Sequence, residues 1–244
     1  MKIKNQELRK QFIDVFQSLT QRYNSHQVWS DFIIMSACTI SNACDLRFYK
    51  EREEMYMDTV KRYKKEELDS FCEMLSLLIM ALTEEPCQDF LGEIYCNLRL
   101  ANGQRGQVFT PYHVAEMMAR MMVSGKINDI TEKGNIADPC CGGGCMLIAY
   151  ANVLKSEGIN YQQKILFVGQ DIDMIAGLMC YIQLSLLGCR CIIKIGDSLS
   201  DPFLDKEPVT NKLWFSPMYM FGNALRLGSI LSAMSSEKAD EKSA

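Results

Sequence analysis

The sequence is poor in the residues that build metal centres and disulfide frameworks. Only two of its 244 residues are histidines, and its 11 cysteines are an odd number. No two cysteines show the C-x2-C spacing of a zinc knuckle, so we expect no bound metal. The alternative is a zinc site formed by the cysteines that lie close together in the sequence, at Cys140–Cys145 or Cys189–Cys191. We interpret the cysteines as small apolar residues of a chain in a reducing compartment.

Long hydrophobic runs and an excess of positive charge are also absent. No stretch reaches 18 uncharged apolar residues, and Met1–Glu7 contains no apolar signal segment, so we expect a cytoplasmic protein without a membrane span. The net charge of −4 excludes binding to nucleic acid through overall charge. A contact with DNA would need a local patch or a partner. The densest basic run, Lys61–Lys65, is more typical of a solvated helix face.

The first half of the chain is patterned as helices. Apolar residues at three- and four-residue steps in Leu8–Leu19 mark the first amphipathic helix. Further helices are predicted at about 27–43, 51–63, from 65 to just before Pro86, and at 87–100. Residues 101–106 are predicted to form a loop. This pattern predicts an all-α N-terminal domain over residues 1–105.

The second half alternates short apolar runs with helical segments, which predicts a mostly parallel α/β sheet over residues 106–234. The expected strands are Asn135–Asp138, Ile165–Gln170, Cys191–Ile195 and Leu213–Phe215. Residues 235–244 are small and charged, and we expect a disordered tail.

A glycine-rich turn follows the first of these strands. The sequence Asp138-Pro139-Cys140-Cys141-Gly142-Gly143-Gly144 has the spacing D-x3-G-x-G, which differs from the G-x-G-x-x-G of dinucleotide binders. It favours a ligand with a charged amino-acid tail, whose ammonium group Asp138 would meet. Taken alone, the turn is equally suited to a tight connection between a strand and a helix.

Acidic residues end the next two strands. Asp171 stands where ribose hydroxyls are bound in such folds, and Asp197 could accept a hydrogen bond from an adenine amino group. Asp173 is better suited to cap a helix, and Asp197 and Ser198 are also ordinary turn residues. Three acids at three successive strand ends, beside one glycine turn, indicate a cofactor site more strongly than any one of them.

A fourth motif, Gly106-Gln107-Val108-Phe109-Thr110-Pro111, precedes the sheet. By physical chemistry it is a helix start, with Thr110 as N-cap and Pro111 at the first helical position. The helix is expected to bury an apolar stripe made of Val114, Met117, Met118, Met121 and Met122.

In this order, the four motifs resemble the N6-adenine DNA methylase family, whose best-known members are modification subunits of type I restriction systems. The resemblance covers roughly residues 89–200. It implies a Rossmann-like, S-adenosylmethionine (SAM)-dependent methyltransferase fold and SAM as the cofactor. The cofactor-binding residues that it implies are Gln107, Phe109, Thr110, Pro111, Asp138, Cys140, Gly142, Gly144, Asp171, Ile172, Asp197 and Ser198.

The family's catalytic tetrapeptide, N/D/S-P-P-Y/F, corresponds here to Ser216-Pro217-Met218-Tyr219. Ser216 and the carbonyl of Pro217 would accept the two hydrogens of the adenine amino group, and Tyr219 would stack on the flipped base. Met218 replaces a second proline that would aim the Pro217 carbonyl, so we predict weakened or absent catalysis. A buried strand end without chemistry is the competing interpretation.

Only residues 220–244 follow the tetrapeptide, so we expect a shortened sheet with an open edge covered by a partner or a homo-oligomer. The leading hypothesis is methylation of the adenine amino group in DNA, with a partner protein that recognises sequence. A catalytically weak or inactive SAM-binding subunit with an interaction role is the main alternative. Methyl transfer to protein or RNA is a third. The sequence leaves the choice between adenine and cytosine amino groups open.

Overall fold

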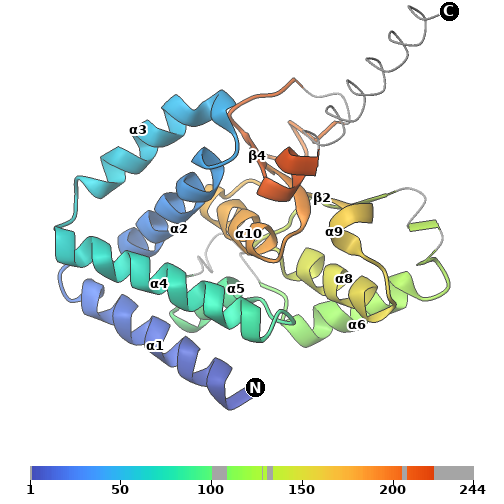
Figure 1. Cartoon of the computed structure of the whole chain (residues 1–244), viewed down its shortest axis with the longest axis horizontal. Helices are drawn as coiled ribbons and strands as arrows, with labels where there is room; N and C mark the ends of the chain where they lie inside the picture. The colour runs from blue at the N-terminus through green and yellow to red at the C-terminus, as the bar shows by residue number, and fades with distance from the viewer. Residues whose placement is uncertain (1, 101–108, 128, 131–133, 205–207, 223–244) are drawn as a thin grey trace, which may run out of the picture.

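The computed structural model describes residues 2–100, 109–127, 129–130, 134–204 and 208–222 (Figure 1). The predicted terminal helix and tail beyond residue 222, and the predicted cofactor residue Gln107, lie outside these ranges. The described chain has a helical N-terminal half followed by an α/β sheet, so the predicted fold class is confirmed. No described helix is long and apolar enough to cross a membrane.

The N-terminal half forms the predicted helices, α1 (Lys2–Thr20), α2 (Ser25–Asn42), α3 (Tyr49–Val60), α4 (Lys65–Glu84) and α5 (Phe90–Asn97), with a short 3-10 turn η1 (Leu46–Phe48). Helix α1 packs along α4, and α2 packs along α3. Edge-to-face contacts of Phe12 with Trp29, Phe32 and Phe90 join α1, α2 and α5 in one aromatic core.

The sheet has the order β1-β2-β3-β4, formed by β1 (Asn135–Asp138), β2 (Leu166–Asp171), β3 (Arg190–Ile195) and β4 (Leu213–Phe215). The first three strands are parallel, as predicted, and end side by side. Strand β4 runs antiparallel to β3, with Phe215 opposite Ile192 and Leu213 opposite Lys194. Among the described strands, β1 pairs only with β2 and therefore lies at an edge of the sheet.

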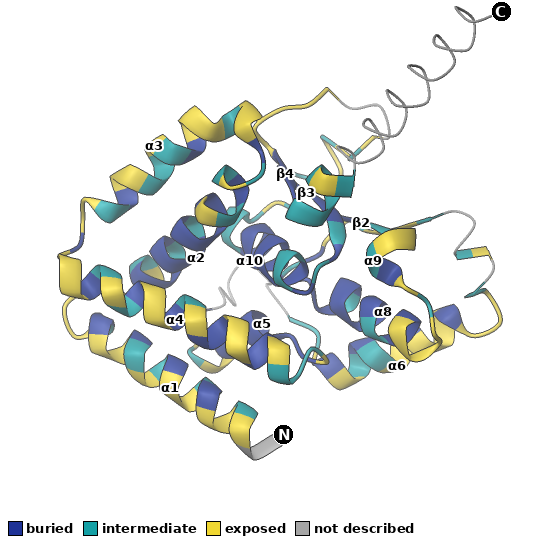
Figure 2. Cartoon of the chain, in the orientation of Figure 1, coloured by how far each residue is buried: buried dark blue, intermediate teal, exposed yellow. Residues whose placement is uncertain are grey.

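Helix α10 (Met174–Leu186) joins the two halves. It packs against β2 and β3 on one side and against α2 and α5 on the other, and every residue from Ala176 to Leu184 is buried. Figure 2 shows this helix in dark blue at the centre of the molecule. A helix that is apolar all round is one that is enclosed all round. The buried core is therefore continuous across the expected boundary near residue 105, and the division into two domains stays a prediction.

Helices α6 (Tyr112–Val123) and α8 (Cys145–Ser156) pack together, and α9 (Tyr161–Lys164) precedes β2. The expected buried methionine stripe of α6 is wrong, because its four methionines are 42 to 70% exposed. The buried face consists of Tyr112, Ala115, Ala119 and Val123. Small alanines on this face allow α8 to approach closely. The helix begins at Tyr112, so Pro111 rather than Thr110 stands at its cap.

Two arginines fasten β4 to the helical half. Arg52 of α3 donates a hydrogen bond to the Leu213 carbonyl at 2.7 Å, and its guanidinium lies 4.1 Å from the centre of the Trp214 ring. Arg47 lies 4.4 Å from the Phe215 ring centre. Asp45 pairs with both arginines and has no exposed side-chain surface. Because Arg52 is itself buried, the strand is held by a desolvated ionic network.

Candidate cofactor site

The glycine turn forms the floor of a hollow at the carboxyl ends of the parallel strands. Gly142 and Gly144 adopt φ angles of +51° and +96°, which L-residues with side chains rarely adopt. A Cβ atom at Gly144 would also stand 2.8 Å from the Cys180 sulfur of α10. These two glycines therefore let the chain turn sharply from β1 into α8 while it rests directly on α10.

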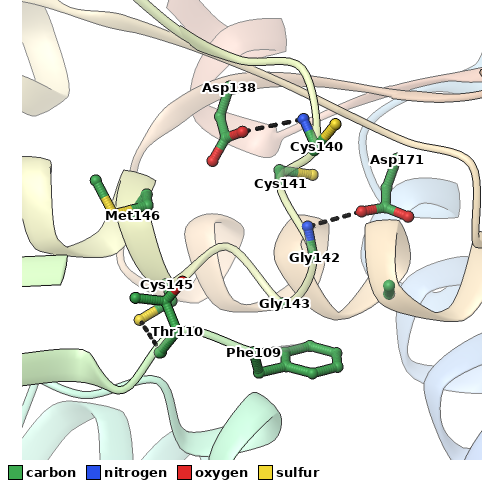
Figure 3. Close-up of a pocket in the computed structure, with 11 residues that line it drawn as sticks. Phe109, Thr110, Asp138, Cys140, Cys141, Gly142, Gly143, Cys145, Met146 and Asp171 are labelled. Atoms are coloured by element: carbon green, nitrogen blue, oxygen red, sulfur yellow. Dashed lines mark hydrogen bonds between the residues drawn. The ribbon is translucent and has the colours of Figure 1, made fainter. Parts of the chain in front are cut away.

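Backbone hydrogen bonds fix the turn to the second strand. The Cys141 N–H donates to the Gln170 carbonyl at 2.9 Å, and the Gly142 N–H donates to the Asp171 carboxylate at 2.8 Å. The other Asp171 oxygen accepts the Asp173 N–H at 2.8 Å. Asp173 caps α10, as its position predicted. Asp171 is thereby held at the turn, with its carboxylate aimed along the wall of the hollow (Figure 3).

The hollow has a volume of about 200 Å³. Figure 3 shows the Asp138 and Asp171 carboxylates on either side of the turn, with Phe109 and Thr110 below it. Phe109 lies against Gly142 and packs edge-to-face on Tyr95 of α5. The lining residues are Phe109, Thr110, Asp138, Cys140, Cys141, Gly142, Gly143, Cys145, Met146, Asp171 and Ala176.

The two carboxylates of the hollow are electrostatically unlike most surface acids. Burial raises the pKa of Asp138, opposed by a hydrogen bond from the Cys140 N–H. Burial also raises the pKa of Asp171, against its two backbone hydrogen bonds. A partly desolvated carboxylate is stabilised by any cation or hydroxyl donor that enters beside it. The hollow is thus suited to a ligand that carries such groups.

The structure brings together six of the predicted cofactor residues, which are Phe109, Thr110, Asp138, Cys140, Gly142 and Asp171. Gly144 shapes the turn without lining the hollow, and Pro111 lines the neighbouring cavity. Ile172 is 73% exposed. The Ser198 hydroxyl lies 3.9 Å from the Cys140 sulfur, at the edge of the site.

Asp197 also stands outside the lining. Its carboxylate accepts hydrogen bonds from the Leu199 N–H and the Ser200 hydroxyl, both at 2.9 Å. These bonds lower the pKa of Asp197 and use the side chain as a turn cap. Its role toward adenine therefore stays a prediction.

Residues that sequence reasoning missed lie beside those it found. Cys141, Gly143, Cys145 and Met146 belong to the turn or the first turn of α8, and their neighbours in the motif were the available signal. Ala176 carries no such signal. It lines the hollow because it lies in the first turn of α10, just after the Asp173 cap.

The predicted catalytic residues lie elsewhere. Ser216 is buried at the amino end of β3, where its hydroxyl donates to the Cys189 carbonyl and accepts from the Cys191 N–H, at 2.8 and 2.9 Å. Residues 217–222 continue as a helix, and the Tyr219 ring packs on Phe215 at 5.2 Å between centres.

The direction of β4 explains this placement. An antiparallel strand delivers its carboxyl end to the amino end of its neighbour. The five residues from Cys191 to Ile195 span about 13 Å of strand between the first and last Cα atoms, and the hollow lies beyond them. The catalytic roles of Ser216, Pro217 and Tyr219 stay predictions that this arrangement does not support.

The sequence profile of the N-6 DNA methylase family matches residues 87–219, more than half of the chain. The chain belongs to this family. The match begins just before α5 and ends at Tyr219, so it takes in the glycine turn, the parallel strands and the tetrapeptide. The family predicted from the motifs is confirmed.

Two known proteins are similar to this methylase-family chain over part of their length. The methylase subunit of the type I restriction enzyme MjaVII from Methanocaldococcus jannaschii is 31% identical over 102 residues, which make up 41% of this chain. The chain spans only 16% of the length of that relative. A solved structure from Listeria monocytogenes, described as a class I S-adenosylmethionine-dependent methyltransferase, is 17% identical with a TM-score of 0.45. That similarity covers 86% of this chain and 57% of the other.

Proposed function

We propose that this chain is the SAM-binding part of a methyltransferase that acts on the exocyclic amino group of adenine in DNA, together with a partner protein that recognises sequence. The observation that carries the proposal is the pair of half-buried carboxylates, Asp138 and Asp171, facing a hollow above a glycine turn. Family membership supports the reaction class and the DNA substrate.

The residues of the hollow fit the polar ends of SAM. A carboxylate can accept about four hydrogen bonds, and the described bonds to Asp171 number two. Its remaining lone pairs suit ribose hydroxyls, and Asp138 suits the ammonium of the amino-acid tail. When bound, SAM would supply an activated methyl group. The chain's own residues would orient it between the turn and Phe109.

The first experiment is calorimetric titration of the purified chain with SAM. We expect micromolar binding, and Asp171→Ala should weaken it by about a hundredfold because it removes charged acceptors worth about 1.5–3 kcal/mol each. Asp58→Ala, which removes an exposed acid of α3, is the matched control and should leave the affinity unchanged. Absence of binding by the unaltered chain, or an Asp171→Ala variant that binds normally, would contradict the proposal.

The second candidate function is a SAM-binding subunit without catalysis of its own, and the placement of Ser216 favours it. Because the Ser216 hydroxyl is already bonded to the backbone of Cys189 and Cys191, it is not available to a DNA base. Transfer of labelled methyl groups from SAM to adenine-containing duplex DNA separates the two candidates. If the chain is a SAM-binding subunit without catalysis of its own, we expect no methyl transfer by the isolated chain and none by the Met218→Pro variant. Transfer that rises in Met218→Pro would support the catalytic hypothesis instead.

A further inference from the structure

The underside of the glycine turn rests on one buried amide, Gln183 of α10. Its Nε2 group donates hydrogen bonds to the Gly143 carbonyl and to Asp89 Oδ1, both at 2.8 Å. Its Oε1 atom accepts the Leu91 N–H at 3.0 Å. Both donors of the amide are thus used, and the side chain is fully buried. Three segments far apart in the sequence therefore meet at this side chain: the glycine turn, the start of α5 and the middle of α10.

Asp89 is the second part of this support. Its carboxylate, also buried, accepts the Gly92 N–H at 3.0 Å and caps α5. The carboxylate folds so closely over the helix start that a side chain at Gly92 would collide with it. A Cβ atom at Gly143 would stand 3.3 Å from Asp89 Oδ1. Burial raises the pKa of Asp89, while the hydrogen bonds from Gln183 and Gly92 oppose that rise.

Helix α2 contributes to the same support. Trp29 donates its indole N–H to the Met179 sulfur at 3.4 Å. The Met179 methyl group lies 3.3 Å from the position of a Cβ atom at Gly143. The turn therefore has the hollow on one side and α10, α5 and α2 on the other. Figure 1 shows α2 and α5 beside the central α10.

We propose that Gln183 and Asp89 are positioning residues for the cofactor. They hold the Gly143 peptide on the side of the turn that faces α10. The side that faces the hollow then keeps the shape that receives SAM. This inference rests on the proposed function. It also makes the helical half a structural support of the cofactor hollow, because Asp89 and Trp29 both come from that half.

The test compares SAM affinities of folded variants. Gln183→Leu and Asp89→Leu should each raise the Kd about tenfold, the loss expected when a buried hydrogen bond of about 1.4 kcal/mol no longer orders the site. Asp89→Asn should stay within about twofold of the unaltered chain, because an amide oxygen accepts the same two hydrogen bonds. Normal affinity in Gln183→Leu would overturn the proposal.

Asn152→Leu is the matched control. Asn152 of α8 is an amide that donates to the Pro86 carbonyl and the Tyr112 hydroxyl, at 2.9 and 3.1 Å, and it does not contact the turn. Its loss should lower the melting temperature but leave the Kd unchanged. An equal loss of affinity in this variant would mean that general destabilisation, rather than positioning, weakens binding, and would overturn the proposal.

Hydrogen exchange provides a readout that needs no ligand. The amides of Gly142 and Gly144 are bonded to Asp171 and to the Cys141 carbonyl. Their exchange should be about tenfold faster in Gln183→Leu than in Asn152→Leu. If Gln183→Leu does not fold, Gln183→Glu keeps the side-chain length and takes its place. Unchanged exchange would overturn the positioning role. Failure of the unaltered chain to bind SAM would instead overturn the proposed function.

Discussion

The segments that lie at the two ends of strand β3 differ in strand direction, in chemistry and in proposed use. At the carboxyl end, three parallel strands finish side by side, and the chain leaving the first two carries Asp138 and Asp171 into one hollow. At the amino end, antiparallel β4 delivers Ser216 into the backbone of β3. Both ends carry motifs that the sequence marks as functional. In this sheet, a motif that follows a strand reaches the hollow only when that strand runs parallel to β1, β2 and β3.

The hollow and the β4 network, which is formed by Asp45, Arg47 and Arg52, have their charges arranged in opposite ways. Burial raises the pKa of Asp138 at the carboxyl end. Beside β4, burial alone would raise the pKa of Asp45, but Arg47 and Arg52 bring it below its ordinary value. The hollow keeps a half-buried carboxylate that an incoming cation would stabilise. The β4 network has already satisfied its carboxylate from within the fold.

Removing Arg52 should give the largest effect and tests whether the β4 network and the hollow are independent. Arg52→Ala leaves buried Asp45 and the Leu213 carbonyl without this partner, and should cost about 3–5 kcal/mol of unfolding free energy, measured by urea titration. The SAM affinity of the folded variant should stay within about twofold. Lys61→Ala, at an exposed ion pair, should change little. A parallel loss of affinity would show that the β4 network and the hollow act as one unit.

Ser216→Ala should have a smaller effect, confined to the amino end. The variant leaves the Cys191 N–H and the Cys189 carbonyl without the serine hydroxyl, at a cost of about 1–3 kcal/mol. Thermal unfolding measures the loss. Ser76→Ala, at a serine exposed on α4, is the control. SAM titration should give an unchanged Kd. Weaker cofactor binding would place Ser216 at the site and break the comparison.

The smallest expected effect is a pair of pH dependences with opposite signs. A raised folded-state pKa means that folded Asp138 holds its proton to higher pH than the unfolded chain does, so its contribution to stability falls as pH rises through that window. The lowered pKa of Asp45 acts in reverse, because its contribution is present above the ordinary value of 3.8 and is lost as pH falls through the folded pKa.

Urea unfolding between about pH 3 and pH 7 measures both signs. Compared with the unaltered chain, Asp138→Asn should gain relative stability as pH rises, and Asp45→Asn should lose it. Equal slopes for the two variants would contradict the contrast between the hollow and the β4 network.

Local sequence predicted most of the fold and part of the site. Apolar spacing located the N-terminal helices, and the predicted strands agree with the observed bounds to within one residue. The glycine turn and Asp171 were predicted because their geometry depends on residues next to them in the sequence. The turn needs the positive φ of Gly142, and Asp171 ends its strand just before the Asp173 cap. The methionines of α6 misled the burial prediction, because only packing against α8 determines which face is covered.

The sequence by itself determined which segments form helices and strands, where the chain turns sharply, and which family it belongs to, because propensity, periodicity and motif spacing act over a few residues. Only the tertiary structure decided that β4 runs antiparallel, that Ser216 bonds to the β3 backbone, and that Gln183 and Asp89 meet beneath Gly143. These contacts join residues 25 to 94 positions apart. They depend on how whole elements pack, which no local pattern encodes.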